Sequence, residues 1–93
     1  MKKCLKIRVC GIVQGVAYRA HAQKHAQHLG VEGTIQNAED GSVVIYACGP
    51  AATLEKFIDY LYQGTAKSQI EDLLAEPFVN EKDFRGAFRI IGD

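Results

Sequence analysis

Residues 9–19 combine an apolar strand, two glycines and an arginine in an order that suits the binding of a phosphate group. The stretch reads Val-Cys-Gly-Ile-Val-Gln-Gly-Val-Ala-Tyr-Arg, and a helical pattern begins at its end. Backbone N–H groups, the positive end of the helix dipole and the Arg19 guanidinium therefore point to one place. The loop lacks the Lys-Ser/Thr ending of a nucleotide-binding P-loop and the third glycine of a dinucleotide fingerprint, so neither common motif applies.

Successive backbone N–H groups in this loop are the candidate phosphate ligands. They belong to Gln14, Gly15, Val16, Ala17 and Tyr18. The glycine at position 15 allows a backbone conformation that is closed to other residues. A tight strand-to-helix turn that needs glycine only for its shape fits the local pattern equally well.

Two side chains beside the loop, those of Arg19 and Asn37, are candidates for binding an anion and a water molecule. Arg19 lies in the first helical turn, off the apolar stripe, where a cation opposes the helix dipole unless an anion shares the site. Asn37 shares the two-residue period of Val31 and Ile35, and its amide both accepts from a water and donates to an oxyanion. The alternatives are a solvated surface arginine and an asparagine that opens the turn at 38–41.

Three histidines follow the loop at spacings of four and three residues. Neighbours among His21, His25 and His28 are close enough on a helix to share a metal, but no carboxylate or cysteine joins them. A solvated or partly packed helix face explains them better. The chain also lacks a Ser–His–Asp arrangement, and we expect no metal and no cofactor.

The composition describes one small domain, expected over residues 1–93. Eleven basic and eleven acidic residues cancel, so no excess of charge favours nucleic acid or a membrane surface. The sequence has neither a signal peptide nor an 18-residue apolar run, which favours a cytoplasmic protein. We also expect the protein to be a monomer. The three cysteines are too few for a disulfide framework.

Hydrophobic periodicity predicts the elements that position these residues. Leu5–Val9 alternates as a strand, and an apolar stripe from Tyr18 to Leu29 indicates a helix. The remaining ranges are strands at 31–37, 43–48, 69–76 and 87–91, a second helix from Gly49-Pro50 to Gly64, a turn at 38–41 and a polar loop at 80–83.

This order predicts an α+β fold, a ferredoxin-like β-α-β-β-α-β sandwich with an extra C-terminal strand and two helices on one face of a mixed sheet. The first two strands are parallel with the third inserted between them. The C-terminal ends of the first and second strands, which carry the glycine loop and Asn37, then lie on the order of 10 Å apart. That gap accommodates a phosphate and a water.

Two sequence blocks resemble the acylphosphatase family. Residues 11–19, Gly-Ile-Val-Gln-Gly-Val-Ala-Tyr-Arg, match the signature G-x-V-Q-G-V-x-[FY]-R. Residues 29–37, Leu-Gly-Val-Glu-Gly-Thr-Ile-Gln-Asn, followed by Asp40-Gly41-Ser42-Val43, resemble the second motif, L-G-[LV]-x-G-x-V-x-N-x-x-D-G-x-V. The similarity covers nearly the whole chain, and two linked motifs of this length are specific.

The resemblance implies hydrolysis of acyl phosphates to a carboxylate and inorganic phosphate. By the family pattern, the loop from Gln14 to Arg19 holds the phosphoryl group, Arg19 binds it by charge and Asn37 positions the attacking water. Thr34 departs from the pattern, because family members often carry an aromatic residue there, and we expect altered packing beneath Asn37. The alternative function is a non-catalytic ferredoxin-like module that binds phosphate or handles carbamoyl phosphate.

Cys4 and Cys48 are candidates for a disulfide. Cys4 opens the first strand and Cys48 closes the third, and antiparallel neighbours place these ends side by side, away from the glycine loop. We expect a bridge in purified, air-exposed protein with Cys10 left as a thiol, and reduced thiols inside the cell.

Overall fold

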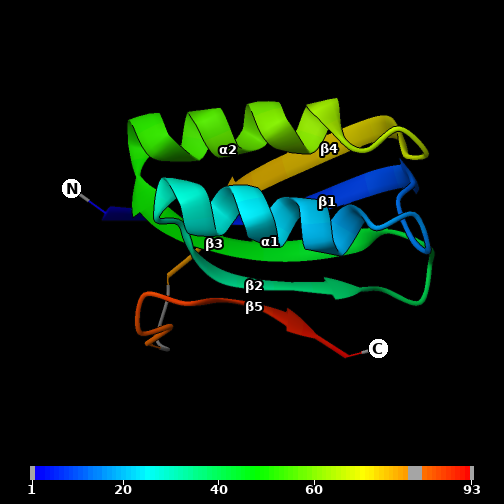
Figure 1. Cartoon of the computed structure of the whole chain (residues 1–93). Coiled ribbons are helices and arrows are strands. Elements are labelled where there is room, and N and C mark those ends of the chain that lie inside the picture. Colours follow the sequence, from blue (N-terminus) through cyan, green and yellow to red (C-terminus); the bar gives the residue numbers. More distant parts are fainter. Residues whose placement is uncertain (1, 80–82, 93) are drawn as a thin grey trace.

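Two helices lie side by side on one face of a five-stranded sheet (Figure 1). The computed structural model describes residues 2–79 and 83–92. The elements are β1 (Lys2–Ile12), α1 (Tyr18–Leu29), β2 (Glu32–Asn37), β3 (Val43–Pro50), α2 (Ala51–Gln63), β4 (Gln69–Pro77) and β5 (Phe88–Ile91). This arrangement confirms the predicted ferredoxin-like fold with an extra C-terminal strand. Residues 80–82 of the expected polar loop lie outside the described residues.

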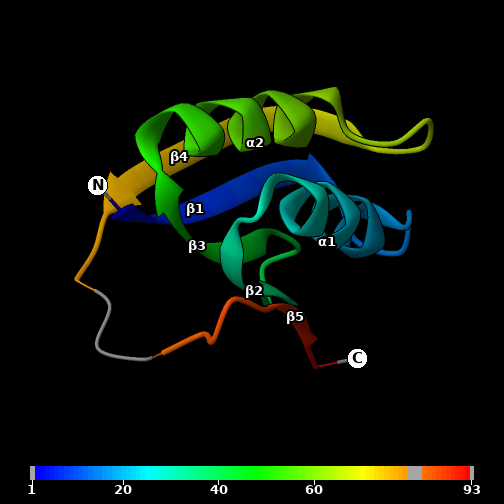
Figure 2. The same cartoon turned by 60° about the vertical axis from the view of Figure 1, so that its left-hand side comes forward.

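The strand order is β4-β1-β3-β2-β5, with β3 in the centre as its apolar sequence predicted. Because β3 is antiparallel to both β1 and β2, these two strands run parallel and end at the same side of the sheet. β5 pairs with β2 in parallel and makes the sheet mixed. Figure 2 shows the two-layer arrangement, with α2 over the β1–β4 side and α1 toward β2.

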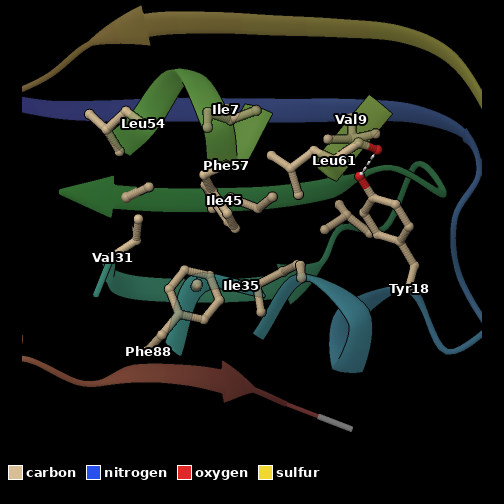
Figure 3. Packing of buried hydrophobic residues seen from close by; sticks show 14 of the residues in the cluster. Ile7, Val9, Tyr18, Val31, Ile35, Ile45, Leu54, Phe57, Leu61 and Phe88 are labelled. Atoms are coloured by element: carbon tan, nitrogen blue, oxygen red, sulfur yellow. Dashed lines mark hydrogen bonds between the residues drawn. The ribbon is translucent and has the colours of Figure 1, made fainter. Parts of the chain in front are cut away.

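The core fills the space between the helices and the sheet (Figure 3). α2 contributes Leu54, Phe57 and Leu61, which are spaced to form one apolar stripe. These side chains meet the inward-facing residues of the strands, among them Ile7 and Ile45, both fully buried. The opposite face of the sheet carries no helix, so polar side chains alternate with the buried ones along β1.

β1 is longer than the sequence predicted. It continues past Val9 through Gly11 to Ile12, because Gly11 and Ile12 pair with the start of β4 across an irregularity in register at Cys10. A side chain at Gly11 would collide with the carbonyl oxygen of Gln69, so this glycine allows a close approach of two strands. The sequence pattern predicts this glycine as the start of a loop, and that prediction is wrong because Gly11 pairs with Ile70 of β4.

Cys4 and Cys48 lie directly opposite each other in the β1–β3 register. Their sulfur atoms are joined in a disulfide at the end of the sheet away from the β1–α1 loop. Within the described residues, Cys10 remains a thiol. No described helix has both the length and the apolar character needed to span a membrane.

Candidate active site

The β1–α1 loop, the β2–β3 turn and the α2–β4 loop lie at one end of the molecule (Figure 1). The β1–α1 loop lies between the other two segments and contacts both through hydrogen bonds. The predicted phosphate ligands are therefore held from two sides by segments that lie far from them in sequence.

Two residues of the loop, on either side of Val16, have a positive φ angle. Gly15 has φ 71° and Ala17 has φ 61° and ψ 22°, both left-handed, whereas Val16 between them does not have a positive φ. Such alternation turns successive N–H groups toward a common point and forms a concave anion site. Ala17 is also the residue that precedes α1, so the positive end of the helix dipole adds to the same site.

The Gln14 side chain closes the β2–β3 turn. Its Nε2 donates to the carbonyl oxygen of Ala38 at 2.8 Å and to that of Ser42 at 2.9 Å. The same two residues are bonded directly, Ala38 N–H to Ser42 O at 2.8 Å. Gln14 thus ties the loop to the backbone immediately after Asn37, a role for its side chain that the sequence did not indicate.

The turn is also held from the uncovered face of the sheet. Arg8 Nη1 donates to Ser42 Oγ at 2.7 Å and to Asp40 Oδ2 at 3.3 Å. Ser42 Oγ and its N–H both donate to Asp40 Oδ1, and these hydrogen bonds lower the pKa of the Asp40 carboxyl. The carboxylate is therefore ionised at neutral pH and serves as an acceptor within the turn.

Tyr18 joins the start of α1 to the end of α2. Its ring is buried, and its hydroxyl donates to the carbonyl oxygen of Leu61 at 2.8 Å (Figure 3). Burial raises the pKa of the Tyr18 phenol, so the hydroxyl stays neutral and remains a donor. This bond fixes the first helical turn, and with it the position of Arg19.

Arg19 reaches across to the C-terminal end of β5. Its Nη1 donates to the carbonyl oxygen of Ile91 at 3.3 Å. Ile91 lies opposite Gln36 in the parallel β2–β5 pairing. Since adjacent strands are about 4.8 Å apart, the guanidinium lies close to the end of β2, which Asn37 terminates.

Asn37 lies on the helix-covered face of the sheet, as its period predicted. It pairs with Val43, which in turn lies opposite Val9 of β1. Its Oδ1 atom is buried and has no hydrogen-bond partner among residues 2–79 and 83–92. A buried amide oxygen without a partner is unfavourable unless a small polar molecule binds there.

Thr34 lies on the opposite face of β2 from Asn37. Its neighbours in register are Tyr46 and Arg89. The expectation that a missing aromatic residue at this position alters packing beneath Asn37 is therefore wrong, because successive side chains of a strand point to opposite faces.

His21 and His25 pack against each other and against Tyr60. The His25 ring stacks on Tyr60 with centroids 3.8 Å apart and meets His21 edge-on at 4.6 Å. His21 Nε2 lies 2.9 Å from the carbonyl oxygen of Tyr60. Within the part of the chain that the structure describes, no three metal-binding side chains gather at one point.

Two contacts of the loop were not predicted from the sequence. Thr65, in the α2–β4 loop, donates from Oγ1 to the carbonyl oxygen of Val16 at 3.0 Å. Ile91 supplies the backbone oxygen that receives Arg19. Neither residue belongs to a motif, and both contacts depend on long-range placement, so no local pattern identifies them.

Comparison with known proteins identifies relatives along the whole chain. The sequence model of the family described as Acylphosphatase matches residues 5–90. A protein of Azoarcus sp. (strain BH72) named "Acylphosphatase" is 47% identical over 64 residues, which are 69% of this chain and 65% of that protein. One of Vibrio parahaemolyticus with the same name is 36% identical over 89 residues, 96% of this chain and 97% of that protein. The crystal structure of acylphosphatase from Bacillus subtilis superposes with a TM-score of 0.91 at 29% identity and covers 99% of this chain and all of that one.

Proposed function

Because this chain belongs to the acylphosphatase family and hydrolyses acyl phosphates, we propose that residues 14–19 hold the phosphoryl group and that Asn37 positions the attacking water. The products are a carboxylate and inorganic phosphate. The observation that carries this proposal is the pair of positive φ angles at Gly15 and Ala17, with Val16 between them lacking one, directly before α1. Backbone N–H groups arranged in this way bind the oxygen atoms of a phosphate dianion, and they do so without the help of a side chain.

Arg19 supplies the fixed positive charge of the site. Its bond to Ile91 O orients the guanidinium plane at the end of β2 and β5. A planar guanidinium grips two phosphate oxygens at once, and it remains charged throughout the reaction. Charge spreads over the equatorial oxygens in a loose, metaphosphate-like transition state, and Arg19 together with the loop amides stabilises that charge.

Asn37 acts on the nucleophile. Its buried Oδ1 accepts a hydrogen bond from the water, and the water thus supplies the partner that this atom lacks among the described residues. The amide holds the water for in-line attack on phosphorus, and the carboxylate of the acyl group leaves on the other side. The water's proton passes to the phosphate.

The reaction proceeds without a cofactor in this proposal. A carboxylate is a weak base and leaves without a proton donor, so the site needs position and charge rather than an acid–base pair. Full activity in the presence of a chelator supports this proposal. Inhibition by the chelator that a divalent metal reverses contradicts it.

Release of phosphate from benzoyl phosphate by the purified protein tests the function. Folded protein that binds inorganic phosphate but does not release it from benzoyl phosphate would instead be the non-catalytic phosphate-binding or carbamoyl-phosphate-handling module. A panel of acyl phosphates then ranks the substrates by kcat/KM. The panel is needed because the backbone amides bind the phosphate group and do not select among acyl groups.

The cellular setting belongs to the same proposal. We place the protein in the cytoplasm as a monomer that binds neither nucleic acid nor membrane, in keeping with its balanced charge. Analytical ultracentrifugation checks the monomer, and sedimentation as a dimer contradicts it.

A further inference from the structure

Thr65 holds the β1–α1 loop from the side of the α2–β4 loop. Its Oγ1 donates to the carbonyl oxygen of Val16 at 3.0 Å, across 49 residues of sequence. The same oxygen accepts from the N–H of Ser68 at 3.1 Å. Because that N–H occupies the acceptor side of the hydroxyl, the hydroxyl hydrogen is directed to Val16.

Thr65 is held in a closed turn. Its N–H donates to Ser68 Oγ at 2.7 Å, and Ser68 N–H donates to the Thr65 carbonyl oxygen at 3.2 Å. The turn follows Gly64, whose φ of 62° and ψ of −158° are accessible to glycine alone. Thr65 therefore projects from a defined backbone rather than from a loose connection.

The hydrogen bond from Thr65 to the Val16 carbonyl oxygen also fixes the direction of the next N–H group, that of Ala17. The Val16–Ala17 peptide is trans, like every described peptide bond, and the C=O and N–H of a trans peptide point in opposite directions. When Thr65 holds the Val16 oxygen, the Ala17 N–H is aimed away from the α2–β4 loop. Ala17 is also a non-glycine residue in the left-handed region, a conformation that persists only where its surroundings fix it.

We propose that Thr65 is a positioning residue for acyl phosphate hydrolysis and that it aims the Ala17 N–H at the phosphoryl group. This inference rests on the proposed function, in which residues 14–19 are the phosphate cradle. Thr65 touches neither the substrate nor the water. It acts through the orientation of one peptide plane, and loss of its hydroxyl frees that plane to rotate.

Three variants separate this role from a general effect on the turn. Thr65→Val keeps the shape and removes the donor, whereas Thr65→Ser keeps the donor. Ser68→Ala removes the side chain that closes the turn but leaves the Ser68 N–H and the Thr65 hydroxyl in place. For each variant we would measure kcat/KM with benzoyl phosphate, the inhibition constant of inorganic phosphate, and the shift of the Ala17 amide proton when phosphate is added.

For Thr65→Val we expect kcat/KM to fall about tenfold and the phosphate inhibition constant to rise by a similar factor, as for the loss of one well-placed hydrogen bond. The Ala17 amide proton should lose its response to phosphate. Thr65→Ser should recover both constants, and Ser68→Ala should stay within about twofold of the parent while its unfolding temperature falls.

The inference is overturned by three results: unchanged constants in Thr65→Val, no recovery in Thr65→Ser, or an equal loss in Ser68→Ala. Arg19→Lys serves as the reference for the cradle itself. If Arg19→Lys binds phosphate as the parent does, the cradle proposal fails. If only Arg19→Lys weakens phosphate binding and Thr65→Val does not, the role of Thr65 alone fails.

Discussion

The side-chain amide of Gln14 donates a hydrogen bond to the carbonyl oxygen of Ser42, 28 residues further along the chain, at 2.9 Å. A second hydrogen of the same amide goes to the Ala38 carbonyl oxygen. One side chain thereby spans the mouth of the turn that follows Asn37. The residue that binds phosphate through its backbone in our proposal also fixes, through its side chain, where the attacking water is held.

Replacing the Gln14 amide tests this link. A carboxylate has no hydrogen to donate and would face two carbonyl oxygens, so Gln14→Glu should lower kcat/KM for benzoyl phosphate about tenfold or more, and Gln14→Ala should lower it less. Gln27→Glu, at an exposed position on α1, is the matched control for the added charge. Equal rates in Gln14→Glu and the parent would remove the side chain from any role in the site.

Arg19→Lys conserves charge but loses the planar fork that grips two phosphate oxygens. We expect kcat/KM to fall by about 100-fold or more, together with weaker inhibition by inorganic phosphate. Arg89→Lys, at an exposed position of β5, is the control and should retain the parental rate. A near-parental kcat/KM in Arg19→Lys would exclude Arg19 from catalysis.

Asn37→Ala separates rate from affinity. In our proposal the amide acts on the water and the loop holds the anion, so kcat should fall about 100-fold while the inhibition constant of inorganic phosphate changes little. Steady-state kinetics with phosphate as inhibitor measure both. If affinity falls as far as the rate, Asn37 belongs to the phosphate cradle instead.

The Cys4–Cys48 bridge should be detectable by thiol counting. Under denaturing, non-reducing conditions, aerobically purified protein should expose one thiol, that of Cys10, and three thiols would contradict the bridge. Reduction should lower the free energy of unfolding by roughly 2–4 kcal/mol, because the bridge constrains the unfolded chain. The activity of the folded enzyme should persist, since the bridge lies at the far end of the sheet.

His25 should make stability depend on pH. Burial, followed by the nearby charges of His21, Lys24 and His28, lowers the pKa of His25 below its ordinary 6.5. The unfolded chain therefore binds the proton first as the pH falls, so the stabilising effect of neutral His25 is complete above pH 6.5 and is lost as the pH drops through the folded pKa. His25→Gln should flatten the pH dependence of the unfolding temperature over this range, whereas His28→Gln, which removes only the smallest of the charge effects on His25, should flatten it much less.

The fold could be predicted largely because its elements have clear periods. The stripe of Leu54, Phe57 and Leu61 admits only a helix with one buried face, and the alternation along Leu5–Val9 admits only a strand. The length of β1 could not be predicted, because its extension to Ile12 depends on β4, which lies more than fifty residues later and pairs with it across a bulge.

The candidate site residues could be named from motifs, but the groups that hold them in place could not. Gly15, Arg19 and Asn37 lie in two recognisable blocks. The acceptors of Gln14 and Arg19 are backbone oxygens, which any residue type provides, and sequence carries no signal for them. Thr65 is a common loop residue whose contact with Val16 exists only once α2 has packed.

The hydrogen bonds that hold residues 14–19 have a consequence for when the site can form during synthesis of the chain on the ribosome. The loop leaves the ribosome early, yet its partners lie 24, 49 and 72 residues later in the chain. Closing such distant contacts is slow, and none of them forms before its own segment has been made. The nascent chain thus carries Arg19 and Asn37, the two side chains that we propose to be catalytic, well before it can act. The proposed site is therefore complete only after β5 has docked, and a chain cut before Ile91 would lack the carbonyl oxygen that accepts the hydrogen bond from Arg19.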